Sequence, residues 1–186
     1  MVREQQFTLS FQPSTDMTTI DINTVPPFYQ GYIKQVQHLD FIEAMNKSQN
    51  DMNEFLKALP SSKENYAYAP GKWTIKELLC HVIDAERIFT YRALCFSRNE
   101  KKNLPGFDEN AYVPESNAAH RSILSITQEL NNLRASTLDF FRSCTEEMLE
   151  RTGTANNTSL SVLMLGYIVS GHEIHHLNIL KERYMK

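Results

Sequence analysis

The chain has 186 residues and a formal net charge of −3, which suits one domain that can bury a sizeable core. Its charges are scattered in both signs without a basic stripe, which argues against a nucleic-acid partner. The N-terminus lacks a secretion signal, and no stretch is apolar enough to span a bilayer, so we expect a cytoplasmic protein without membrane contact. The odd, unclustered set of Cys80, Cys95 and Cys144 also fits a reducing compartment.

We expect residues 1–25 to form a polar tail and residues 26–186 to form a single domain. Apolar spacing and helix-start signals predict helices over 28–37, 41–59, 75–97, 118–144 and 160–183. We expect loops over 61–72, 99–116 and 153–158, and no stretch alternates long enough to predict a strand. Four long amphipathic helices in one small domain predict an all-α four-helix bundle, whose long connections cross over or line a site.

The most informative motif is the run Gly171-His172-Glu173-Ile174-His175-His176 in the last predicted helix. His172 and His176 are four positions apart, so a helix stacks them on one face. That face is otherwise apolar, which predicts that both histidines point into the bundle core. His175 falls at the edge of this face, where it can be a second-shell residue, a hydrogen-bonded rim residue or an exposed one.

Two histidines on a buried apolar face each need a polar partner, and one metal ion would satisfy both, although structural histidines are the alternative. His81 is the best third ligand because it faces inward on the helix predicted over 75–97. Its neighbours Glu77 and Asp84 lie within one turn and can orient it or approach the site. We expect Arg87 and Arg92, on the same helix, to form surface ion pairs.

The histidine run also matches H-E-x-x-H, the motif of helix-borne zinc proteases, in which Glu173 would be the general base. Such enzymes take a third ligand from downstream, but Ile179 and Glu182 occupy the positions where the extended motif has glycine and histidine. We therefore reject the protease interpretation. Glu173 points about 100° away from His172, so it can act as a base or, equally, cap or pair at the surface.

Five motifs together resemble the DinB superfamily of metal-binding four-helix bundles: residues 70–77 leading into His81, 84–87, 91–94, 104–109 and 171–176. The resemblance extends from about residue 28 to residue 184. It implies an up-and-down bundle with a long crossover, in which His81, His172 and His176 hold a divalent transition metal, usually zinc or nickel. It also implies a homodimer, and characterised relatives include transferases and isomerases that use a low-molecular-weight thiol.

On this basis we expect a metal-dependent transferase that attaches a low-molecular-weight thiol to a small electrophile. The alternatives are a metal-dependent hydrolase of a small molecule and a non-catalytic bundle in which the metal or the histidines are structural. Trp73, Phe107, Asp108 and Tyr112 are candidates for the mouth of the site, although we favour ordinary loop packing for Trp73. No catalytic residue beyond the metal ligands is predicted, and no separate signature of a thiol-binding site is present.

Overall fold

The computed structural model describes residues 20–186, which form seven α-helices and one β-hairpin. The helices are α1 (Pro27–Ile33), α2 (Phe41–Lys57), α3 (Ile75–Ser97), α4 (Glu109–Glu115), α5 (Ile123–Arg142), α6 (Glu146–Glu150) and α7 (Val162–Ile179). The strands are β1 (Thr152–Ala155) and β2 (Thr158–Ser161). Residues 1–19 of the predicted tail lie outside the described residues, whereas Ile22–Thr24 form a 3-10 turn and Val25 is buried.

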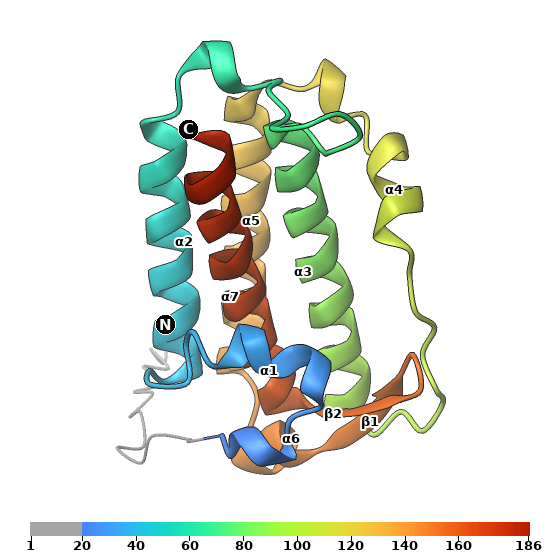
Figure 1. The fold of residues 1–186 in the computed structure, drawn as a ribbon. Coiled ribbons are helices and arrows are strands. Elements are labelled where there is room, and N and C mark those ends of the chain that lie inside the picture. Colours follow the sequence, from blue (N-terminus) through green and yellow to red (C-terminus); the bar gives the residue numbers. More distant parts are fainter. Residues whose placement is uncertain (1–19) are drawn as a thin grey trace, which may run out of the picture.

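The four long helices α2, α3, α5 and α7 form the bundle (Figure 1). Each of α2 and α3 packs against both α5 and α7, so α2 lies diagonally opposite α3, and α5 lies diagonally opposite α7. Helices α2 and α7 run in one direction and α3 and α5 in the other, because the connection carrying α4 returns along the length of α3 (Figure 1). The predicted four-helix bundle with a long crossover is confirmed.

Side-chain caps mark the starts of two of the long helices. Thr74 and Glu77 form a reciprocal capping box at the start of α3, in which the Thr74 backbone N–H donates to the Glu77 carboxylate at 2.7 Å. Asp40 caps α2 by accepting from the backbone N–H of Ile42 at 2.8 Å. None of the described helices is long and apolar enough to cross a membrane, and all three cysteines are free.

The β-hairpin replaces the loop that we predicted over 153–158, so the expectation of no strand was wrong. Strands β1 and β2 pair antiparallel, and the two turn residues Asn156 and Asn157 adopt left-handed conformations with φ of 49° and 59°. These values suit the tight hairpin turn that asparagine tolerates. The strands are four residues each, too short for alternation to show, and the Asn-Asn pair was the available signal. The hairpin holds the loop before α4, because Leu104 exchanges backbone hydrogen bonds with it at 2.9 Å.

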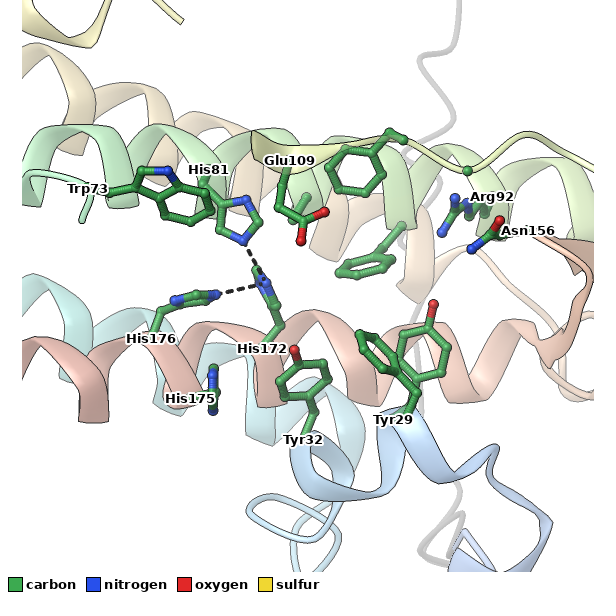
Figure 2. Close-up of a pocket in the computed structure, with 15 residues that line it drawn as sticks. Tyr29, Tyr32, Trp73, His81, Arg92, Glu109, Asn156, His172, His175 and His176 are labelled. Carbon is green, nitrogen blue, oxygen red and sulfur yellow. Dashed lines mark hydrogen bonds between the residues drawn. The ribbon is translucent and has the colours of Figure 1, made fainter. Parts of the chain in front are cut away.

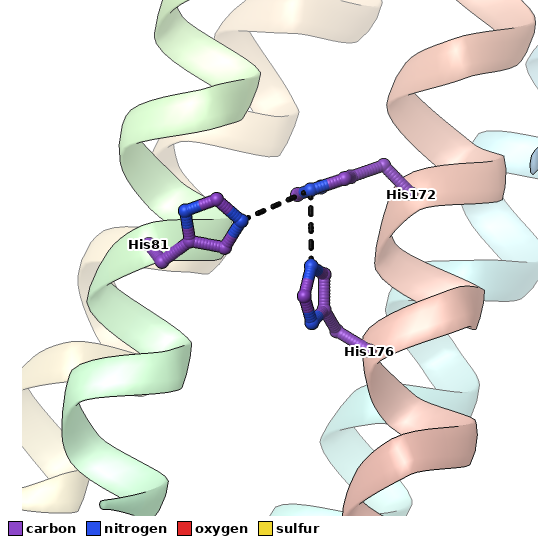
Figure 3. A group of neighbouring side chains, drawn as sticks. All are labelled: His81, His172 and His176. Atoms are coloured by element: carbon purple, nitrogen blue, oxygen red, sulfur yellow. Dashed lines mark hydrogen bonds between the residues drawn. The ribbon is translucent and has the colours of Figure 1, made fainter. Parts of the chain in front are cut away.

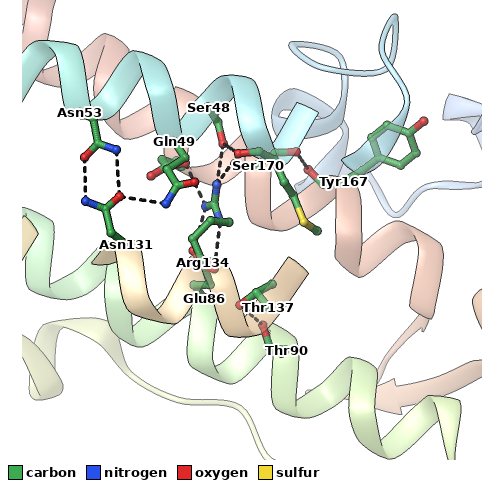
Figure 4. A network of polar contacts seen from close by, with 12 residues as sticks. Ser48, Gln49, Asn53, Glu86, Thr90, Asn131, Arg134, Thr137, Tyr167 and Ser170 are labelled. Carbon is green, nitrogen blue, oxygen red and sulfur yellow. Dashed lines mark hydrogen bonds and ion pairs between the residues drawn. The ribbon is translucent and has the colours of Figure 1, made fainter. Parts of the chain in front are cut away.

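The centre of the bundle contains a buried ionic network that joins all four helices (Figure 4). Arg134 of α5 is fully buried and donates to both carboxylate oxygens of Glu86 on α3 at 3.0 and 2.8 Å. It also donates to the Met45 carbonyl at 2.7 Å and to the Ser48 hydroxyl at 2.9 Å, both on α2. Glu173 of α7 lies 2.9 Å from the same guanidinium and is 1% exposed, so the surface position considered for it was wrong.

Candidate metal centre

Three histidine rings meet between α3 and α7 (Figure 3). The Nε2 atom of His172 lies 3.1 Å from Nε2 of His81 and 3.1 Å from Nε2 of His176. All three side chains are buried, with 6 to 8% of each residue exposed. The structure therefore brings together the three residues that the sequence selected as ligand candidates.

The nitrogen spacing fits a shared cation better than it fits hydrogen bonding. The Nε2 atom of His172 has one in-plane direction, for either a proton or a lone pair, so it cannot form two full hydrogen bonds with His81 and His176. Zinc–nitrogen bonds of about 2.0–2.1 Å in a tetrahedral site place ligand nitrogens about 3.3 Å apart. The observed distances of 3.1 Å are close to that spacing.

Burial keeps the three imidazoles neutral. It lowers the pKa of His81 to about 4, with a partial opposing effect from the charge of Glu109. It lowers the pKa of His176 to about 3 and that of His172 well below its ordinary value, and repulsion from neighbouring histidines adds to both shifts. Near pH 7 each ring therefore has a free lone pair, which is the protonation state that metal binding requires.

The two acidic residues predicted to orient His81 have other partners. Glu77 belongs to the capping box of α3, and Asp84 forms an ion pair with Arg87 at 3.6 Å. Within residues 20–186, neither carboxylate forms a hydrogen bond or ion pair with the three histidines. His175 lies at the margin of the site, as predicted from its helical angle, and its ring packs edge-on against Tyr32 with centroids 5.2 Å apart.

A pocket of about 250 Å³ opens beside the three histidines (Figure 2). Aromatic side chains form much of its wall, and Glu109 of α4 is the one acidic side chain in the lining. The lining consists of Phe28, Tyr29, Tyr32, Trp73, His81, Ala85, Phe89, Arg92, Gly106, Phe107, Glu109, Asn156, His172, His175 and His176. The histidines thus face a cavity of small-molecule size rather than a sealed core.

Two of the four predicted mouth residues line this pocket. Phe107 does so, and Trp73 tilts against His81 with ring centroids 4.9 Å apart, so loop packing alone does not describe it. Asp108 instead caps α4 by accepting from the backbone N–H of Asn110 at 2.9 Å. Tyr112 packs on Phe107 but is not part of the lining, and it is half exposed.

Arg92 also differs from its predicted place. Arg87 forms surface ion pairs with Asp84 and Glu129, as expected. Arg92 is only 4% exposed, lines the pocket and donates to the Pro105 carbonyl at 3.0 Å, so the surface ion pair predicted for it was wrong. Pro105 belongs to the loop before α4, and helical periodicity along α3 gives no information about contacts with that loop.

A glycine allows α1 to supply part of the pocket wall. At Gly171 an added Cβ would lie 2.6 Å from the backbone carbonyl carbon of Tyr32, closer than real Cβ atoms approach. The missing side chain therefore lets α1 pack directly on α7, which places Tyr32 beside His172 and Tyr29 further along the pocket wall toward Arg92 (Figure 2). Neither tyrosine was predicted from the sequence, and Gly171, directly before His172, was the available signal.

The fold and the site define a four-helix-bundle protein with a buried three-histidine cluster at the wall of a pocket. The chain belongs to the DinB superfamily, whose family model matches residues 44–180. It is 23% identical over 145 residues to the Oceanobacillus iheyensis protein named "Putative metal-dependent hydrolase OB0413", covering 76% of this chain and 82% of that protein. Its fold is similar to that of YfiT from Bacillus subtilis, described as a probable metal-dependent hydrolase with an unusual four-helix bundle topology. That structure matches with a TM-score of 0.68 and 15% identity, over 78% of this chain and 85% of YfiT.

Proposed function

We propose that this protein is a metal-dependent hydrolase of small molecules, in which His81, His172 and His176 hold a divalent transition-metal ion. The convergence of three buried, neutral imidazole nitrogens at a pocket wall carries this proposal. Imidazole ligands suit zinc and nickel, and a bound ion of this kind lowers the pKa of a water ligand, to about 7 in zinc hydrolases. The names of the two relatives agree with this reaction class.

Hydrolysis also needs a group that takes a proton from the attacking water, and we assign this role to Glu109. Its carboxylate faces the pocket from α4, and its charge acts on His81 (Figure 2). As the water oxygen adds to the electrophilic centre of the substrate, Glu109 accepts the water proton. When the bond to the leaving group breaks, Glu109 returns that proton to the leaving group.

Transfer of a low-molecular-weight thiol, the reaction that the family resemblance implies, is the competing proposal. It uses the same three histidines, with a thiolate instead of water as the nucleophile. Assays with and without thiol separate the two reactions, because hydrolysis needs no thiol and adds only water to the products. A non-catalytic bundle would bind metal without turnover in either assay. The expected homodimer remains a prediction, which sedimentation velocity tests.

Metal content tests the ligand assignment directly. We expect His81→Ala, His172→Ala and His176→Ala to hold much less metal than the wild-type protein by elemental mass spectrometry. His120→Ala is the matched control, because His120 is exposed and outside the pocket lining. His175→Ala should weaken binding only slightly. Folded triad variants that retain wild-type metal content would rule out the proposed site.

Activity tests the assignment of Glu109. A panel of carboxylic esters, amides and phosphate esters is assayed with metal-loaded protein, after chelation and after metal is restored. We expect Glu109→Gln to lower kcat for a hydrolysed substrate about 10²- to 10⁴-fold, the usual contribution of a general base. Glu115→Gln, on the exposed face of the same helix, should leave kcat unchanged. Hydrolysis that persists at full rate after chelation would contradict the proposed function.

A further inference from the structure

Arg92 is a buried cation without a counter-charge. The residue is 4% exposed, yet within residues 20–186 no carboxylate lies within ion-pair distance of its guanidinium. Its assigned partners are neutral: the carbonyl oxygen of Pro105 at 3.0 Å and the hydroxyl of Tyr29. A guanidinium has five N–H donors, so these two partners leave donors available to a ligand.

Arg134, which is fully buried, shows the contacts of an arginine with a purely structural role in this chain. Arg134 is held by two carboxylates, Glu86 and Glu173. An unpaired buried charge costs several kcal/mol in general, and proteins rarely keep one without a use. Arg92 lines the pocket, whereas Arg134 lies in the solid centre of the bundle (Figures 2 and 4). The missing negative charge at Arg92 therefore belongs to whatever enters the pocket.

The surroundings of Arg92 form one end of the pocket. Figure 2 shows Arg92 and Asn156 at the end opposite the three histidines, with the Tyr29 hydroxyl near them. The β-hairpin places Asn156 there, and Gly106 leaves room for its side chain, since a Cβ at Gly106 would lie 2.8 Å from the Asn156 Oδ1 atom. A guanidinium, a phenol and an amide together offer hydrogen-bond donors in the arrangement that binds oxyanions, and the planar guanidinium can bind two oxygens at once.

We propose that Arg92, with Tyr29 and Asn156, binds an anionic group of the substrate, a carboxylate or a phosphate, at the end of the pocket opposite the three histidines. Arg92 follows His81 by eleven positions, so about 16 Å of helix axis separates their Cα atoms. Cα–Cβ bonds in a helix tilt toward its N-terminus, which for Arg92 is the direction of His81. Ala85 and Phe89, which lie between His81 and Arg92 on α3, line the pocket together with Phe107. The ligand class is thus a small molecule with an anionic end, an apolar middle and the reacting group near the histidines.

The pocket volume agrees with a ligand of this size. At about 250 Å³ it lies just below the range of about 300–1,000 Å³ that is typical of drug-sized ligands. Placing the reacting group at the histidines rests on the proposed hydrolase function. The anion site itself does not, because ligand binding is measured without turnover.

Trp73, the one tryptophan of the chain, lies in the pocket wall, so its fluorescence reports ligand binding. The probes are 4-phenylbutyrate and phenyl phosphate as anions, and 4-phenylbutanamide as the neutral counterpart. Each probe is titrated into the full-length protein as purified and again after chelation. The comparison separates binding of the anion to the protein from binding of the anion to a metal ion. We expect both anions to bind about 10- to 100-fold more tightly than the amide, the usual effect of charged hydrogen bonds, in both preparations. The tighter of the two anions identifies the preferred oxyanion.

Arg92→Gln should abolish the preference for anions and leave binding of the amide unchanged. Arg87→Gln, an exposed change on the same helix, is the matched control and should keep the preference. The affinities for the anions and the amide are also compared in the wild-type protein, so the proposal can be tested even if Arg92→Gln does not fold. Equal binding of anions and amide by the wild type, a preference that disappears on chelation, or a preference that survives Arg92→Gln would each overturn the proposal. If the wild-type protein binds the anions more tightly than the amide but hydrolyses no compound in the substrate panel, only the proposed function is contradicted.

Discussion

Replacing Arg134 by methionine tests whether the buried ionic network holds the four bundle helices together. Arg134 is fully buried, and its guanidinium pairs with Glu86 and Glu173 and donates to two groups on α2. Methionine has a similar length but no charge, so Arg134→Met leaves two carboxylates buried together without a cation. Removing one partner of a buried ion pair costs about 3–5 kcal/mol. Because one cation here serves two carboxylates, we expect a loss at the upper end of that range.

Chemical denaturation followed by circular dichroism gives the free energy of unfolding for this comparison. A loss of about 5 kcal/mol is a third or more of the total stability of an ordinary domain. Arg142→Met on the same helix is the matched control, since Arg142 is exposed and its ion pair with Asp139 spans 3.9 Å. Its effect should stay within about 0.5 kcal/mol.

The double variant Arg134→Met with Glu86→Gln separates loss of charge pairing from loss of packing. The second change removes one of the two stranded charges, so we expect it to recover at least about 1 kcal/mol of the loss, as coupled neighbours do. If Arg134→Met costs less than about 1 kcal/mol, or if Glu86→Gln deepens the loss, charge pairing in the network does not stabilise the bundle.

Two further predictions follow from close contacts at the site. Gly171→Ala should lower the free energy of unfolding by about 1–3 kcal/mol, because the new methyl group overlaps the Tyr32 backbone. Gly31→Ala, with nothing within 4 Å of its added carbon, should be neutral or stabilising in the same denaturation experiment. Tyr184 donates to the Trp73 carbonyl at 2.7 Å, and burial raises its pKa to about 12. The unfolded chain therefore loses this proton first, so stability should fall as the pH rises from about 10 to 12, and Tyr184→Phe should flatten that fall in thermal unfolding scans.

Helical periodicity was sufficient for the bundle and for the three-histidine cluster, because both depend on single helix faces. His172 and His176 share a face of α7 by their spacing alone, and His81 lies on the inward face of α3. The bundle then brings these two faces together, since α3 and α7 are neighbours. The start of α3 was equally local, because Thr74 and Glu77 form their capping box within one turn.

Predictions that required knowing which face of a helix meets which neighbour were less successful. Glu173 does point away from His172, but α7 is buried on almost every side, so that direction leads to Arg134 and not to solvent. Such an all-round buried helix has no polar face from which an outward direction can be read. The hairpin and the wall formed by α1 likewise depend on contacts between distant segments, such as Leu104 with β1 and Tyr32 with Gly171.

The two buried arginines show why the anionic end of the pocket is visible only in the folded chain. Both Arg92 and Arg134 lie on amphipathic helices, and periodicity gives neither of them a partner. Folding supplies Arg134 with carboxylates from two other helices, and it supplies Arg92 with a carbonyl and a phenol, which carry no charge. Each guanidinium stays ionised at neutral pH, so the difference in their counter-charges is a difference in role. The cation that the protein neutralises stabilises the bundle, and the cation that it leaves open to the pocket selects the ligand.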